Sequence, residues 1–409
     1  MLSAAAVAAA LCSVAVAAST AGVAVHHPEG FGPHGRLATI GGPAWSSGSE
    51  RTAVTGDGRI YVAAVPEPSD ASEAVRVRRY LPDGKPDPSF GLVGSLVLEE
   101  LGRRFRLNEL LVDTNGLPYL VGTTADGELV VTRLDEHGGP DPTYGDYGMA
   151  SLGSLPSTAD RPRATIDQEN RVIVTAAATV DRLTPDGALD PTFGTAGTVP
   201  LPDPDVEGLG VDEDGRVQVA LPGEDGKSFR LMRLGVDGET AIRTFRGIGA
   251  ARAIAVRSNG STLVLGSAAK RSGDGVTVPL LSIVARAGDR RSHRSFVHFR
   301  RQGRRAEVLF NADGDDYLIG AREIVDLEIH PNAPFSHGDA LGFFGRNGRV
   351  TISSPGELIA TGASITDSGG TLLVDGIARS PAGGRAHGFL AKFPAAEHVI
   401  TYAPESVGG

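Results

Sequence analysis

Residues 182–197, RLTPDGALDPTFGTAG, decide the fold because the same pattern returns elsewhere in the chain. It occurs at 79–94 as RYLPDGKPDPSFGLVG and at 133–148 as RLDEHGGPDPTYGDYG, and more divergent copies follow at 233–249 and 286–296. A unit that repeats at a fixed period indicates an architecture of stacked copies, each of which is one supersecondary unit. The pattern therefore predicts a repeat fold rather than a chain of unrelated domains.

A second recurring element is a tight turn between two apolar runs, as at Asp57-Gly58 and Asn115-Gly116. Such dipeptides are a strong hairpin signal, and we expect both central residues to take a positive φ. The turns end at residues 58, 116, 170, 215, 260, 314 and 370, which are 45 to 58 residues apart. Each interval has room for four short strands, which is typical of propeller blades. The sequence predicts an all-β fold, a single β-propeller of seven four-stranded blades, with six or eight blades as alternatives.

The two ends of the chain complement each other. The loop at 31–35 and the short run Leu37–Ile40 match the end of a repeat, with no earlier strands of that repeat before them. The last repeat has a turn at Gly369-Gly370 and strand-like runs near 371–374 and 389–393, with no clear fourth strand after them. We expect the N-terminal strand to join the last blade, because ring closure removes exposed sheet edges.

The pattern Arg-Leu-x-x-Asp-Gly-x-x-Asp-Pro-Thr-Phe-Gly-x-x-Gly resembles the bacterial delta-60 repeat family. The match is strongest over residues 79–197. The resemblance implies propeller-type repeats in secreted or surface proteins, and it implies no defined activity.

Residues 1–25 contain no charged side chain and are rich in alanine. They predict a signal peptide, with Ala15-Val16-Ala17 as a small-residue cleavage site. The alternative is an uncleaved membrane anchor, because 25 uncharged residues could cross a bilayer. Residues 26–409 then form the propeller domain, and we expect a secreted or cell-surface protein.

The composition limits the chemistry of the mature chain. Its single cysteine, Cys12, lies in the leader, so the predicted mature chain has no disulfide, thiolate metal site or cysteine nucleophile. The net charge of −10 argues against general binding of nucleic acid, which needs an excess of Lys and Arg. We predict no cofactor and expect a monomer.

The residues that recur in every clear copy are predicted to be structural. An arginine and an aspartate eight residues apart are expected to brace the turn through a bidentate ion pair. A ring of ligand-binding arginines is the alternative. The aromatic residue of each copy is expected to pack between blades. These residues are Arg79, Asp87 and Phe90; Arg133, Asp141 and Tyr144; and Arg182, Asp190 and Phe193.

The repeated turns connect strand A to B and strand C to D, so they share one face of a propeller. The variable segments fall on the opposite face, formed by the B–C and D–A loops. Binding residues concentrate on variable loops held by a rigid scaffold. We therefore expect a binding site on the B–C/D–A face, near the mouth of the central channel.

A basic segment is the first candidate site. The binding candidates are Arg290, Arg291, Arg294, Arg300 and Arg301, in a chain that is otherwise acidic. They could hold an anionic polymer such as a cell-wall glycan. The alternative is a solvated outer strand whose charges prevent edge pairing.

Two further clusters are weaker candidates. Asp313 and Asp315 alternate as calcium ligands do, although the segment lacks the glycine and glutamate of an EF-hand loop. His330 and His337 with Asp339 could bind zinc, but their spacing matches no tight motif. We therefore predict no cofactor, with calcium as the alternative.

No catalytic motif is present: the sequence has no Gly-x-Ser-x-Gly elbow, His-Glu-x-x-His, Walker loop or Rossmann fingerprint. We therefore predict a secreted non-enzymatic binding or scaffold protein whose partner is an extracellular glycan or protein. The alternative is a secreted propeller hydrolase or lyase acting on polysaccharide. Membrane contact is expected only if the leader is not removed.

Overall fold

The structure is a computed structural model, and it describes part of the 409-residue chain. The described ranges are 37–40, 51–65, 74–99, 101, 105–155, 162–257, 260–268, 270–272, 275–283, 292–299, 306–312, 315–320, 323–327, 349–351, 357–366, 371–379 and 387–394. Within these ranges every regular element is a β-strand. They contain no helix long and apolar enough to cross a membrane.

The strands pair in antiparallel sheets, and in the first four sheets and the sixth, strands that are consecutive in the chain are neighbours. The first sheet holds β2 (Arg51–Val54), β3 (Ile60–Ala64), β4 (Val75–Tyr80) and β5 (Ser95–Leu98). The second holds β6 (Arg106–Val112), β7 (Pro118–Thr123), β8 (Glu128–Arg133) and β9 (Met149–Ser154). The third holds β10 (Arg163–Ile166), β11 (Val172–Ala176), β12 (Thr179–Leu183) and β13 (Thr198–Pro200). The fourth holds β14 (Gly208–Val211), β15 (Val217–Pro222), β16 (Ser228–Leu234) and β17 (Thr240–Arg246).

The remaining sheets complete the set in the described ranges. The fifth holds β18 (Ala251–Val256), β19 (Thr262–Gly266), β20 (Lys270–Ser272), β21 (Gly275–Ile283) and β22 (Ser292–Phe299). The sixth holds β23 (Ala306–Ala312), β24 (Asp315–Gly320), β25 (Glu323–Leu327) and β26 (Arg349–Thr351). The last holds β27 (Glu357–Thr366), β28 (Thr371–Arg379), β29 (His387–Pro394) and β1 (Leu37–Ile40), in which β1 pairs with β29.

The second strand of each early sheet explains where the core lies. All five residues of β3 and of β11 are buried, and their sequences IYVAA and VIVTA are nearly continuous apolar runs. Such runs suit strands that are covered on both faces. The outermost strand β17, in contrast, is exposed at six of its seven positions. The core therefore consists of layers between neighbouring sheets, toward the inner strands.

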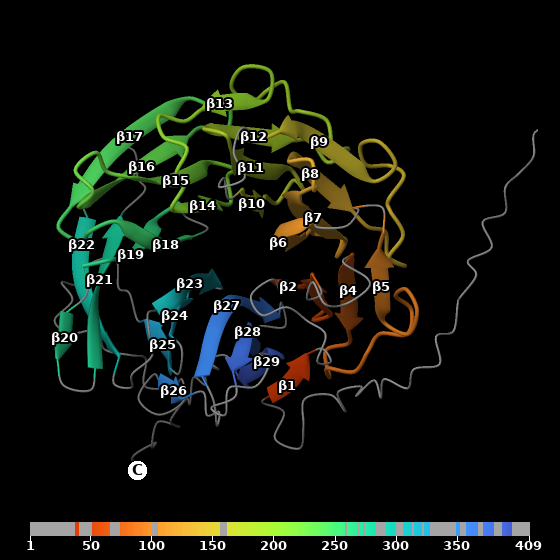
Figure 1. Cartoon of the computed structure of the whole chain (residues 1–409). Helices are drawn as coiled ribbons and strands as arrows, with labels where there is room; N and C mark the ends of the chain where they lie inside the picture. The colour runs from red at the N-terminus through yellow and green to blue at the C-terminus, as the bar shows by residue number, and fades with distance from the viewer. Residues whose placement is uncertain are drawn as a thin grey trace, which may run out of the picture.

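Figure 1 shows the sheets set side by side around a common axis. The first strand of each sheet lies nearest the axis, and these strands contact one another in the series β2, β6, β10, β14, β18, β23 and β27. Strands β27 and β2 also contact each other, although they come from opposite ends of the chain. The innermost strands are therefore the elements that bring residues of different sheets together.

The A–B turns differ from the expected hairpin geometry. At Thr55–Gly58 only the glycine has a positive φ, of 84°, and Asp57 does not. The amide of Gly58 donates to the carbonyl of Thr55 at 2.8 Å, as in a type I turn followed by a left-handed residue. The expectation of a positive φ at both central residues is therefore wrong.

In the second, third and fourth sheets an aspartate at the first turn position favours this geometry. Asp113 Oδ1 accepts the amides of Asn115 and Leu117 at 2.9 and 2.8 Å. Asp167 and Asp212 accept the corresponding amides of their own turns. A short carboxylate that bonds the amide two residues ahead favours this turn conformation.

Candidate functional site

The structure places each repeated arginine against its aspartate. Arg79 Nε lies 2.8 Å from Asp87 Oδ2, Arg133 Nε lies 2.9 Å from Asp141 Oδ2, and Arg182 Nε lies 2.8 Å from Asp190 Oδ2. The expected bidentate geometry does not occur: Nη1 and Nη2 of Arg79 and Arg133 have other acceptors, and Nη1 of Arg182 has no hydrogen-bond partner among the described residues. Arg79 Nη2 donates to Ser89 Oγ, and Arg133 Nη2 donates to Thr143 Oγ1.

The third nitrogen of the guanidinium reaches the next sheet. Arg79 Nη1 donates to the carbonyl of Glu136, and Arg133 Nη1 donates to the carbonyl of Pro185, both at 2.7 Å. Pro185 lies at the position in its own repeat that Glu136 occupies in the preceding one. The arginine thus ties its own loop to the loop of the following sheet.

The aromatic residue of each copy is fully buried between two sheets. Phe90 belongs to one buried cluster with Phe105 and Leu120, and Tyr144 belongs to another with Val172. Phe193 packs against Val217 and Val219. The guanidinium lies over these rings, at 4.7 Å from the centroid of Phe90 and 4.4 Å from that of Phe193. Cation–π contact therefore adds to the ion pair.

We expect the fold to lose stability at low pH because of the three aspartates that face the repeated arginines. Burial raises the pKa of Asp87, Asp141 and Asp190, but hydrogen bonds from Ser89, Thr143 and Thr192 and the facing arginines outweigh it and hold each pKa below its ordinary value.

A carboxylate with a depressed pKa contributes stability that is complete above the unfolded-state pKa of about 4 and is lost as the pH falls through the folded-state value. Urea unfolding of the wild type and of Asp190→Asn at pH 7 and at pH 3 measures this contribution. We expect the difference in unfolding free energy between them to shrink at pH 3, and an unchanged difference would contradict it.

Only part of the basic segment lies in the described residues. Arg294 is exposed on β22, and its Nη2 donates to the carbonyl of Arg246 at 3.0 Å. Arg290, Arg291, Arg300 and Arg301 lie outside the described residues, as do Asp313 and the His330, His337 and Asp339 cluster. Asp315 begins β24. The structure therefore tests neither the basic site nor the metal sites.

Charged residues on the innermost strands form a group that the sequence analysis missed. Arg51, Glu109 and Arg163 each lie four residues before the first residue of their A–B turn, on β2, β6 and β10. Glu207 directly precedes β14. Because these strands contact one another in series, the four residues lie at the same end of the assembly, toward the D–A loops. We call them the inner-strand belt.

Hydrogen bonds fix three members of the belt to the next inner strand. Arg51 Nε donates to the carbonyl of Asn108, and Arg163 Nε donates to the carbonyl of Val206 at 2.9 Å. Glu207 Oε2 accepts the amide of Ala251 at 2.9 Å. The signs of the charges alternate from one inner strand to the next.

Both glutamates of the belt have a raised pKa. Burial raises the pKa of Glu109, although the charges of Arg51 and Arg163 act to lower it. Burial also raises the pKa of Glu207, against the amide of Ala251 and the charge of Arg163. Arg163 thus acts on both glutamates. Shifted acids gathered on one end of a scaffold are a feature of functional sites.

A weak sequence signal for the belt did exist. The position four residues before the A–B turn is charged in the first three copies, Arg51, Glu109 and Arg163. Charged residues are rarely buried without partners, so a charge on an inner strand has to find one. The signal is weak because the sign of the charge changes between copies and the fourth copy has Gly208 at this position.

Comparison with known proteins supports a propeller-type repeat. The family described as "Domain of unknown function (DUF5122) beta-propeller" matches residues 55–90. Among curated proteins, no sequence matches the chain. Among solved structures, Hsv2 of Kluyvelomyces marxianus is similar at 10% identity with a TM-score of 0.41, over 82% of this chain and 94% of that chain.

Proposed function

We propose that this propeller-type chain is a secreted, non-enzymatic binding or scaffold protein, closed into seven blades, whose ligand is an extracellular glycan and whose site lies on the B–C/D–A face. A β-propeller suits a binding or scaffold role, because it holds many loops in fixed positions. The pairing of β1 with β29 and the contact between β27 and β2 support closure. Class averages of the purified chain viewed along the ring axis count the blades, and six or eight would contradict the proposal.

The inner-strand belt is the observation that carries the proposal. Contacts between sheets occupy the A–B end: Tyr61 Oη donates to the carbonyl of Gly116, and Thr114 donates to Asn170 Oδ1. The belt lies at the opposite end, where the segments that vary between repeats lie. Polar groups that alternate in charge suit a hydroxyl-rich ligand, which both donates and accepts hydrogen bonds.

A polysaccharide panel tests this proposal. Recombinant 26–409 is measured against bacterial and plant polysaccharides, with and without calcium, and we expect binding to at least one. Glu109→Gln reports on the belt, and charge reversal of Arg290, Arg291, Arg300 and Arg301 reports on the basic segment. Loss of salt-sensitive binding only on reversal would place the site in the basic segment. Binding to no glycan would overturn the glycan ligand in favour of a protein partner.

A second candidate function is enzymatic cleavage of polysaccharide, as a hydrolase or a lyase, and the raised pKa of Glu109 favours it. A carboxyl whose pKa is raised by burial suits the role of a general acid. Reducing ends released from the panel, and their loss in Glu109→Gln, would support this candidate. Binding without release supports the non-enzymatic function.

We also propose that the chain is exported. Residues 1–25 would act as a cleaved leader, so N-terminal sequencing of the exported monomer should find a start near Ser19 or Val23. A full-length chain that stays with the membrane fraction would instead favour a cell-surface anchor.

A further inference from the structure

A pocket of about 490 Å³ lies between the outer strands of the first two sheets. Its walls are apolar, with Leu98 and Leu101 from the first sheet and its following loop, and Pro140, Tyr147 and Met149 from the second. A pocket of this size with apolar walls and a few polar groups is typical of sites for small molecules. It is distinct from the inner-strand belt, which lies on the strands nearest the axis.

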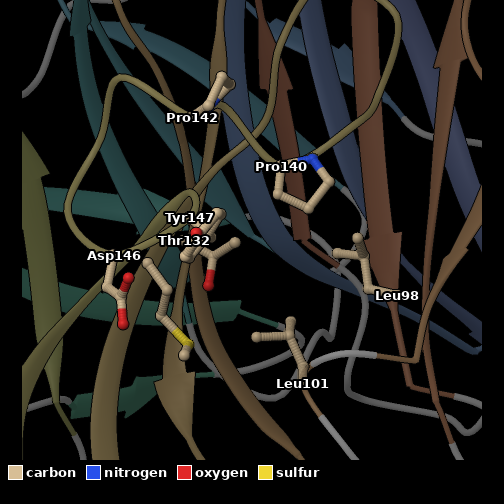
Figure 2. A pocket seen from close by; sticks show the side chains of 8 residues that line it. Leu98, Leu101, Thr132, Pro140, Pro142, Asp146 and Tyr147 are labelled. Carbon is tan, nitrogen blue, oxygen red and sulfur yellow. The ribbon is translucent and has the colours of Figure 1, made fainter. Parts of the chain in front are cut away.

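The lining includes two small polar residues, Thr132 and Asp146. Figure 2 shows Asp146 on one side of the view, Leu98 and Leu101 on the other, and Thr132 with Tyr147 between them. Thr132 is only 5% exposed, and its hydroxyl is buried without a hydrogen-bond partner. The hydroxyl oxygen has almost no surface open to the pocket, so the rest of the Thr132 side chain forms this part of the wall.

The pocket occurs where the second repeat departs from the others. Thr132 pairs across the sheet with Met149. The equivalent pairs are Arg78 with Ser95 in the first repeat and Asp181 with Thr198 in the third. In the third repeat the pair is satisfied, because Thr198 Oγ1 donates to Asp181 Oδ1 at 2.6 Å. The methionine in the second repeat cannot provide such a bond, and it adds an apolar wall instead.

The loop that carries Tyr147 and Asp146 has the common geometry of the repeat. Tyr147 has a φ of 49°, and the equivalent residues Val93 and Ala196 have a φ of 53° each. The conformation therefore belongs to the scaffold, whereas the side chains belong to this repeat alone. Tyr147 is 84% exposed and so presents an aromatic ring at the rim.

Asp146 gives the pocket its charge. It is the one charged residue of the lining, and within the described ranges no cation forms an ion pair with it. An aromatic ring beside a carboxylate attracts an organic cation, because the ring face and the carboxylate both favour positive charge. The charge of the lining therefore selects cations over anions.

We propose that this pocket binds a small amphipathic amine, with its apolar body against Leu98, Leu101 and Met149 and its ammonium group beside Asp146. The proposal is independent of the glycan site, because it uses none of the inner-strand or basic residues.

Three probes that share one ring test the proposal: tyramine, phenethylamine and 3-(4-hydroxyphenyl)propanoate. Their binding to recombinant 26–409 is followed by ligand-observed NMR titration. Probes of this size are expected to bind with a Kd of about 1 mM. We expect tyramine to bind about tenfold more tightly than the carboxylate probe, because Asp146 attracts one and repels the other.

Probe affinities of three variants test which residues of the pocket contact the ligand. Thr132→Val keeps the shape and removes a hydroxyl that has no partner in the protein, so the fold is expected to persist. It should leave the affinities for tyramine and phenethylamine unchanged, because the hydroxyl oxygen has almost no surface open to the pocket. Asp146→Asn should reduce the preference for tyramine over the carboxylate probe to less than about twofold. Met149→Trp should fill the pocket and abolish binding of all three probes.

Asp126→Asn is the matched control, because Asp126 is also an exposed carboxylate of the second sheet and does not line the pocket. It should leave every affinity unchanged. The proposal is overturned if no probe binds at about 10 mM, if all three bind alike, or if Met149→Trp binds tyramine as the wild type does while its thermal midpoint is unchanged.

Discussion

Arg79→Ala is expected to lower the free energy of unfolding by about 3–5 kcal/mol, because it leaves the carboxylate of Asp87 buried without its cation. The side chains of Arg79 and Asp87 are 2% and 6% exposed. The same substitution removes the hydrogen bond to the carbonyl of Glu136 in the next sheet and the cation–π contact with Phe90. Urea unfolding followed by circular dichroism measures the loss.

Lys85→Ala serves as the control for this prediction. Lys85 lies 2.8 Å from Asp83, but both side chains are exposed, so the pair is expected to contribute nothing measurable. The double variant Arg79→Ala, Asp87→Ala should be less destabilised than the sum of the single variants, because it leaves no unpaired charge. Equal effects of Arg79→Ala and Lys85→Ala would show that the buried pair has no structural role.

Gly145→Ala is expected to cost about 2–5 kcal/mol, which combines backbone strain with overpacking. Gly145 has a φ of 53°, and an added methyl would overlap the backbone carbonyl of Met149. Its amide donates to the carbonyl of Asp186 in the next sheet at 2.7 Å, so a shift of the loop would also break a contact between sheets. Thermal and urea unfolding measure the change.

Gly127→Ala separates the two causes. Gly127 has a φ of 83° but open space around the position of a Cβ atom, so only the strain of about 1–2 kcal/mol is expected. If both alanine variants lose the same stability, close packing at Gly145 contributes nothing, and the inter-sheet contact is not the reason for that glycine.

Much of the local structure could be predicted from the repeat. The turn positions, the strands beside them and the spacing of Arg79 and Asp87 all follow from residues within a few positions of one another. The turn type could not be predicted from the Asp-Gly and Asn-Gly pairs alone, because the side chain at the first turn position also accepts amides of the turn, as at Thr55 and Asp113. The prediction of a bidentate ion pair was wrong for a related reason. The other two guanidinium nitrogens of Arg79 donate to Ser89 in the same loop and to the carbonyl of Glu136 in the next sheet.

By itself the sequence determined an all-β chain of repeated hairpins, since strand periodicity and turn chemistry are short-range properties. Only the tertiary structure brought Glu109 between Arg51 and Arg163, which lie 58 and 54 residues away in the chain. Only it showed that Asp146 and Tyr147 line an apolar pocket together with Leu98 and Leu101 of the preceding repeat. Both depend on how successive sheets pack, and packing brings together residues whose distance in the chain carries no information about their contact.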